Sequence, residues 1–204
     1  MSKKTVATVF PAPALRQKVG ELILKAVLEI PTSSETHVEA SQTRAQALGR
    51  TAARQAFLIA GSLALPPGVL GWLTLVPELV GVWRVQAQMV SDIAAVYGKS
   101  AYLGRDQMVY CLFKHVSAQL FRDLVVRVGE RVIVRVFSLS LIQTLAKTLG
   151  VKITQKVIGS GLTRFVPLVG AVGVGAYAYI DTLQVAKTAM ELFSSEITLK
   201  TEDL

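Results

Sequence analysis

The chain has 204 residues and a net charge of +8, and 51% of its residues are hydrophobic while only 18% are charged. An average soluble domain carries about 25% charged residues, so the deficit of charge requires much of the surface to be buried against the chain itself, another subunit or lipid. The length suits one domain rather than two, and the single cysteine, Cys111, excludes an intrachain disulfide, as is typical of a cytoplasmic protein.

The first third of the chain predicts two helices after a flexible tail at residues 1–12. Residues 14–29 place apolar side chains at helical spacing, which indicates an amphipathic helix. A second helix is predicted from about residue 35 to 65, polar first and apolar later, with Gly49 as a point where it can break. Pro66-Pro67-Gly68 then forces a turn.

The middle of the chain predicts two further helices and one ambiguous segment. Residues 69–97 form a helix with a kink at Pro77, and Gly98 ends it. Residues 105–125 predict the next helix. Residues 126–149 are ambiguous, and the ambiguity concerns above all 126–137.

Two patterns compete in that segment. Val128 to Phe137 is β-branched and nearly alternating, which is typical of a strand. Arg127, Arg131 and Arg135, however, recur at the spacing of one helix face. We favour a helix, because isolated strands need partners that the rest of the chain does not offer.

The last third predicts a short helix over 151–159 and a long one over 167–194, followed by a polar flexible tail at 198–204. Together these elements indicate an all-α fold: one compact multi-helix bundle over residues 13–197. Two of its long helices start in apolar segments rich in glycine and proline.

Two apolar stretches raise the question of a membrane. Gln55 to Pro77 contains 23 uncharged residues, but the proline turn divides it, and a spanning helix needs about 20. The stretch from Phe165 to Ile180 has only 16. A buried core, a hairpin that dips into lipid and a true span all stay open, with the core and the hairpin favoured by length.

The same two stretches resemble each other. Val76-Pro77-Glu78-Leu79-Val80-Gly81 is matched by Val166-Pro167-Leu168-Val169-Gly170, and eleven residues lead from each glycine to an acid, Asp92 or Asp181. The pattern indicates a pseudo-two-fold internal repeat, with chance as the rival explanation because these residue types are common here.

At these residues the chain resembles the EcsC protein family. The resemblance runs over roughly 45–195 and is carried by Ala52 to Gly61, Leu75-Val-Pro-Glu78-Leu, Ile93-Ala-Ala-Val-Tyr97-Gly98 and Arg164-Phe-Val-Pro167-Leu-Val-Gly170-Ala. It implies a bacterial, membrane-associated helical protein on the inner face of the membrane, and it brings no catalytic residues. Members of the family more often have Asp where this chain has Glu78.

Several charged residues fall within or beside the apolar helices. A buried carboxylate needs a base or a proton. We therefore predict structural ion pairs or buried polar groups, with Arg84, Arg164 and Lys187 as the candidate bases. The residues concerned are Glu78, Arg84, Asp92, Arg164 and Asp181.

The positive charge is concentrated in one segment. Eleven basic and three acidic residues lie between Lys99 and Arg164, so this segment carries the whole net charge. Such a surface attracts phosphate, and we predict contact with anionic lipid or a membrane protein; nucleic acid is not expected, because the aromatic residues there fall at core spacing. The candidate contacts are Arg122, Arg127, Arg131, Arg135, Lys147, Lys152 and Lys156.

No pattern indicates an enzyme, a metal or a cofactor. Cys111 and His115 lie four residues apart, but zinc needs three or four ligands and His37 is the only other histidine. The glycine-rich stretches have the wrong spacing for phosphate loops and instead suggest close helix packing, as in Ala171-x-x-x-Gly175. We predict a non-enzymatic, membrane-associated helical protein. A soluble module that binds a hydrophobic ligand, and a homo-oligomeric scaffold or pore, are the alternatives.

Overall fold

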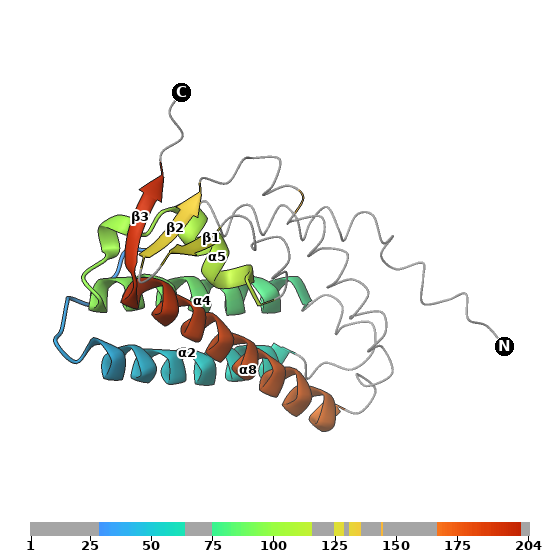
Figure 1. The fold of residues 1–204 in the computed structure, drawn as a ribbon. Coiled ribbons are helices and arrows are strands. Elements are labelled where there is room, and N and C mark those ends of the chain that lie inside the picture. The colour runs from blue at the N-terminus through green and yellow to red at the C-terminus, as the bar shows by residue number, and fades with distance from the viewer. Residues whose placement is uncertain are drawn as a thin grey trace.

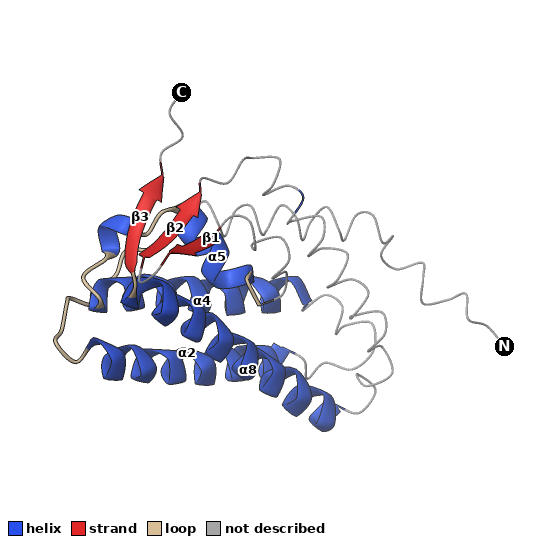
Figure 2. Ribbon diagram, in the orientation of Figure 1, coloured by secondary structure: helices blue, strands red, loops and turns tan. Residues whose placement is uncertain are grey.

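The computed structural model describes residues 29–63, 75–115, 125–128, 131–135, 144 and 167–200. Helices form the body of this part of the chain, and a small sheet lies beside them (Figures 1 and 2). The helices are α2 (Ser41–Leu63), α4 (Leu75–Val96), α5 (Arg105–Phe113) and α8 (Pro167–Ser194), with a 3-10 turn, η1 (Ser100–Tyr102), between α4 and α5. The predicted helical bundle is confirmed as the core of the fold, whereas the predicted internal repeat stays a prediction.

The three long helices pack side by side (Figure 1). α2 and α8 are antiparallel, since Gly49 lies against Ala186 while Gly61, at the other end of α2, lies against Ala171. α4 is antiparallel to α2, because its start contacts Ile59 through Gly81 and its end lies beside Val38. α4 and α8 therefore run in the same direction.

Small side chains explain why α8 packs so closely on α2. Among the described side chains of α2, the buried apolar ones are alanines, at positions 45, 52, 53, 56 and 60, and the partly buried Ile59 packs beside them. A Cβ added at Gly49 would lie 2.9 Å from the Cβ of Ala186, so the two helices approach each other closely there. α2 is continuous through Gly49, and the break that we considered there is wrong: the glycine serves packing instead.

Larger side chains from α4, α5 and the second half of α8 fill the centre of the core. Ile93, Met108, Leu192 and Phe193 are all buried, and the ring of Trp83 packs edge-on against Phe113. α5 ends at Phe113, earlier than the predicted 125, and its last seven residues are buried. Gly98, with a φ of 70°, ends the α4 segment as predicted.

The sheet contradicts the helix that we preferred after residue 126. β1 (Val125–Val128) pairs antiparallel with β2 (Arg131–Arg135), and β2 pairs in parallel with β3 (Glu196–Lys200). The expected tail at 198–204 thus begins with the last residues of a strand. The missing partner that argued against a strand is β3, which follows directly after α8 and is far from β2 in sequence.

The remaining predicted helices can be compared only in part. The helices predicted over 14–29 and 151–159 lie outside the described residues, apart from residue 29. α8 has the bounds predicted for it, and α4 begins at Leu75, inside the predicted 69–97.

Candidate functional site: an exposed apolar face on α2 and α8

The outer side of α2 and α8 is unusually apolar for a surface. Leu58 is 66% exposed, Val172 59% and Ile180 55%. These side chains come from the C-terminal half of α2 and the N-terminal half of α8, which lie together because the helices are antiparallel. We call this surface the α2/α8 face. It consists of Arg54, Phe57, Leu58, Val172, Ala176, Tyr177, Tyr179 and Ile180.

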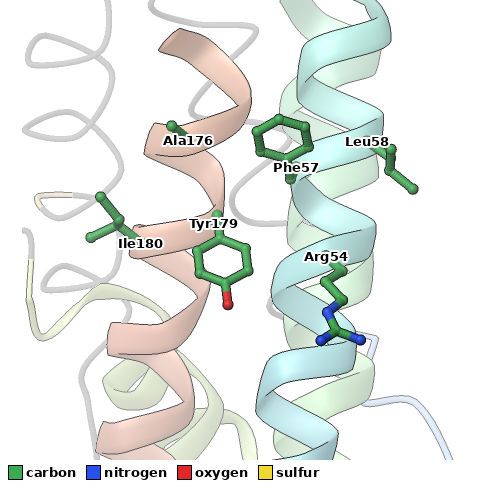
Figure 3. A pocket seen from close by; sticks show the side chains of 6 residues that line it. All are labelled: Arg54, Phe57, Leu58, Ala176, Tyr179 and Ile180. Carbon is green, nitrogen blue, oxygen red and sulfur yellow. The ribbon is translucent and has the colours of Figure 1, made fainter. Parts of the chain in front are cut away.

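A groove runs along this face between the two helices (Figure 3). Its volume is about 580 Å³, and it is partly open to solvent. Each helix contributes residues spaced by three and four positions, which places them on one side of the helix. The lining residues are Arg54, Phe57 and Leu58 from α2 and Ala176, Tyr179 and Ile180 from α8.

Gly175 brings the two helices together beside this groove. A Cβ at this position would lie 2.9 Å from the carbonyl oxygen of Phe57 and 3.0 Å from its ring. The absence of a side chain therefore allows α8 to approach the backbone of α2. The Ala171-x-x-x-Gly175 spacing, which we interpreted as a close-packing motif, makes this contact, with Ala171 opposite Gly61.

The electrostatics of the face favour anions. α2 contains three arginines and no acidic residue. Arg44, at the far end of the helix, forms a two-fold hydrogen bond with Glu35, at 2.6 and 3.0 Å, and this hydrogen bond lowers the pKa of the Glu35 carboxyl. Within the described residues, the exposed Arg54 has no acidic partner.

Asp181, the one acid of α8 near the groove, is turned away from it. One of its oxygens lies 2.7 Å from His115 Nε2, and the other accepts a hydrogen bond of 2.8 Å from the Gln86 amide. That amide also donates to the buried Thr182 hydroxyl. The His115 and Asp181 side chains are only 14% and 18% exposed. The carboxylate is thus bound on the inner side of α8 and adds no exposed acid to the α2/α8 face.

Asp92 has a different role from Asp181. It accepts hydrogen bonds from Ser33, at 2.6 Å, and from Gln88, at 2.9 Å. Gln88 also donates to the carbonyl of Thr32. These contacts attach the segment before α2 to the side of α4, so Asp92 is a structural polar group. Its partners are hydroxyl and amide groups rather than the predicted bases.

The other predicted ion-pair residues do not form that pattern. Arg84 is exposed on α4, so the prediction that it is a buried ion-pair residue is wrong. Lys187 lies 4.0 Å from Glu191 instead of pairing with Asp181. Glu78 belongs to α4, but its side chain is outside the described part, and Arg164 lies outside the described residues.

The predicted arginine row is divided by the sheet. Arg131 and Arg135 are four residues apart on β2 and so belong to the same face of the sheet. Arg127 is paired with Val132, the neighbour of Arg131, and so belongs to the opposite face. The three arginines would share one face only on the predicted helix, which the strands replace. Arg122, Lys147, Lys152 and Lys156 lie outside the described residues.

Cys111 and His115 do not share a site. Cys111 is fully buried, and burial raises the pKa of its thiol well above the ordinary range, so the thiol stays protonated and unreactive. His115 instead contacts Asp181. No group of three or more potential metal ligands occurs among the described residues.

Comparisons with protein-family models, with curated proteins and with solved structures return no match for this chain. The resemblance to the EcsC family therefore remains a prediction. Among the described helices, none combines the length and the apolarity needed to cross a membrane.

Sequence reasoning missed the α2/α8 face. Its residues were all visible as part of two apolar stretches, but these stretches also contain buried alanines at similar spacing. Hydrophobic periodicity alone does not say which side of such a helix is covered. The one distinguishing signal was Arg54, placed one helical turn before Leu58 without an acid nearby in sequence.

Proposed function

We propose that this protein associates peripherally with anionic membranes, with the α2/α8 face turned toward the lipid. The observation that carries the proposal is an exposed apolar surface from two helices, which has no exposed carboxylate and includes Arg54, an arginine without an acidic partner among the described residues. Exposed apolar patches of this kind are typical of sites that bind a protein or a membrane.

The distribution of polar residues along the two helices supports a membrane as the partner. Towards the N-terminus of α2 the exposed residues are mostly polar or charged, including Arg44, Gln46 and Arg50. Towards its C-terminus come Phe57 and Leu58, opposite the apolar start of α8. An amphipathic surface with an apolar region, basic residues at its border and tyrosines beside them is typical of proteins at the lipid–water interface.

The expected strength of the association is that of a reversible contact. Full burial of one exposed leucine or isoleucine contributes about 1.5–3 kcal/mol, and one basic residue near an anionic surface about 1 kcal/mol. Only a few such groups are available, and part of each is already covered. We therefore propose a peripheral, binding role rather than a catalytic one, on the inner face of a bacterial membrane as the EcsC resemblance implies.

This proposal moves the lipid contact away from the basic middle segment. Arg131 and Arg135 lie on β2, next to the strand that follows the C-terminus of α8. The exposed apolar residues of α8 lie in its N-terminal half, so the two regions are at opposite ends of that helix.

Flotation with phospholipid vesicles tests the proposal. We expect the protein to float with vesicles that contain phosphatidylglycerol and to float less with pure phosphatidylcholine. Leu58→Glu and Ile180→Glu should each reduce flotation strongly, because they place a carboxylate in the apolar face. The matched control is Gln46→Glu, which makes the same change of charge on an exposed part of α2 about 18 Å away along the helix.

Three results would contradict the proposal. One is a protein that stays unbound with both kinds of vesicle. Another is equal loss of flotation in Gln46→Glu and Leu58→Glu, which would indicate a general charge effect. The third is a concentration-dependent dimer that Leu58→Glu converts to a monomer while flotation is unchanged, since a second copy would then cover the face.

A further inference from the structure

The groove on the α2/α8 face has a polar end and an apolar end. Figure 3 shows the Arg54 guanidinium and the Tyr179 hydroxyl at the same end, and Phe57 and Ala176 at the other. The walls themselves are almost wholly apolar, so Arg54 contributes its aliphatic stem and Tyr179 its ring, with their polar groups at the rim. The groove thus has the polarity of an amphiphile: a head at one end and a chain along the rest.

The positive charge at the polar end favours an anionic head group. Arg50 lies one helical turn before Arg54 and is also exposed, and α2 has no acid that would repel an anion. The nearest described acid on α8, Asp181, is held by His115 and Gln86 on the inner side of the helix. A planar guanidinium binds phosphate through two parallel hydrogen bonds.

The openness of the groove favours a lipid within a bilayer over a small amphiphile carried through water. Pockets that carry a small ligand through water bury about 70–90% of its surface. This groove is partly open to solvent, and its lining includes the exposed Leu58 and Ile180. A chain in the groove would therefore still touch its surroundings, which is favourable only if those surroundings are other acyl chains.

We infer that the groove between α2 and α8 seats a part of one acyl chain of an anionic phospholipid within a bilayer, with the lipid phosphate bound by Arg54 and the Tyr179 hydroxyl. The volume of about 580 Å³ lies within the range of about 300–1,000 Å³ typical of ligand sites. This inference rests on the proposed membrane association and adds to it a ligand class and an orientation. The Arg54 end lies at the level of the phosphates, and the Phe57 end points toward the acyl region.

Photo-crosslinking tests this lipid site, which we call the seat. The probe is phosphatidylglycerol with a diazirine in one acyl chain, incorporated into phosphatidylcholine vesicles, and labelled residues are mapped by mass spectrometry. One parallel arm uses a diazirine phosphatidylcholine, and another uses a diazirine fatty acid without vesicles. We expect phosphatidylglycerol to label the groove residues about fivefold more than phosphatidylcholine, as one basic residue near an anionic surface allows, and the free acid to label them weakly.

Variants separate the seat from general membrane binding. Arg54→Gln should remove the preference for phosphatidylglycerol, and Arg54→Lys should restore part of it. Ala176→Phe should fill the groove and abolish labelling there while flotation continues, because the face stays apolar. Its matched control is Ala47→Phe, the same enlargement at an exposed position outside the groove. Circular dichroism checks that each variant is folded, and Arg54→Gln, at an exposed position, tests the seat independently of Ala176.

The outcomes distinguish the two proposals. Flotation with labelling scattered over the surface, or labelling that Ala176→Phe leaves unchanged, overturns the seat and leaves membrane association standing. Strong labelling by the free acid without vesicles overturns the bilayer as the source. Absence of flotation in every arm overturns the membrane association and with it the seat.

Discussion

Around Asp181, the two sides of α8 reverse the usual distribution of polar and apolar residues. On the inner side, Asp181 and Thr182 are held by Gln86 and His115, and these contacts satisfy both carboxylate oxygens. On the outer side, the neighbouring Ile180 is exposed. Because successive residues of a helix differ by about 100° in direction, fixing Asp181 inward also fixes Ile180 outward. The inward contacts of Asp181 therefore agree with the outward direction of Ile180 on the α2/α8 face.

The first prediction compares two aliphatic residues on opposite sides of α8. Leu192 is buried and Ile180 is 55% exposed. We expect Leu192→Ala to lower the free energy of unfolding by about 2–5 kcal/mol, because it leaves a cavity. Ile180→Ala should change it by less than about 0.5 kcal/mol. Urea denaturation measures both, and similar losses would mean that the outer side is covered.

The second prediction concerns the polar contact itself. Asp181→Ala leaves His115 Nε2 without its partner and leaves the Gln86 amide with Thr182 alone, and an unsatisfied buried group costs about 1–3 kcal/mol. Gln184→Ala, one turn further along on an exposed position, is the control and should be nearly neutral. Equal denaturation midpoints for the two variants would show that the contact does not fix α8.

The third prediction compares two glycines of α8. Gly175 contacts the backbone of α2, whereas a Cβ at Gly173 would meet no atom within 4 Å. We expect Gly175→Ala to destabilise the fold by about 1–3 kcal/mol through crowding. Gly173→Ala should stabilise it by about 0.5–1 kcal/mol through helix propensity. Thermal unfolding gives the sign of each change, and the same sign for both would contradict the close contact.

The smallest effect concerns the polar end of α2. The hydrogen bond from Arg44 lowers the pKa of Glu35 in the folded state. The pair therefore stabilises the fold above the ordinary titration range of glutamate, and this stabilisation is lost as the pH falls through the lowered pKa. Glu35→Gln should unfold slightly more easily at neutral pH and as easily as the parent protein in acid. A difference that persists in acid would assign the effect to something other than this ionisation.

Local patterns predicted the helices well where local physics decides. The bounds of α8 followed from a proline at its first residue and an uninterrupted helical pattern, and Gly98 ended α4 because only glycine adopts a φ of 70° at low cost. The strands were mispredicted because the partner of β2 is β3, which no local pattern reveals. The contact between His115 and Asp181 could not be predicted for the same reason, since it joins residues from the two halves of the chain.

The parallel pairing of β2 with β3 has a consequence for how the chain is made. Synthesis proceeds from the N-terminus at about 5–20 residues per second, and Glu196 emerges long after Arg131, its partner. Until then, the edge of β2 lacks its partner β3, and the alanine-lined side of α2 lacks its partner α8. The order of translation thus leaves an unpaired strand edge and an uncovered helix face for several seconds, and contacts this distant in sequence close slowly.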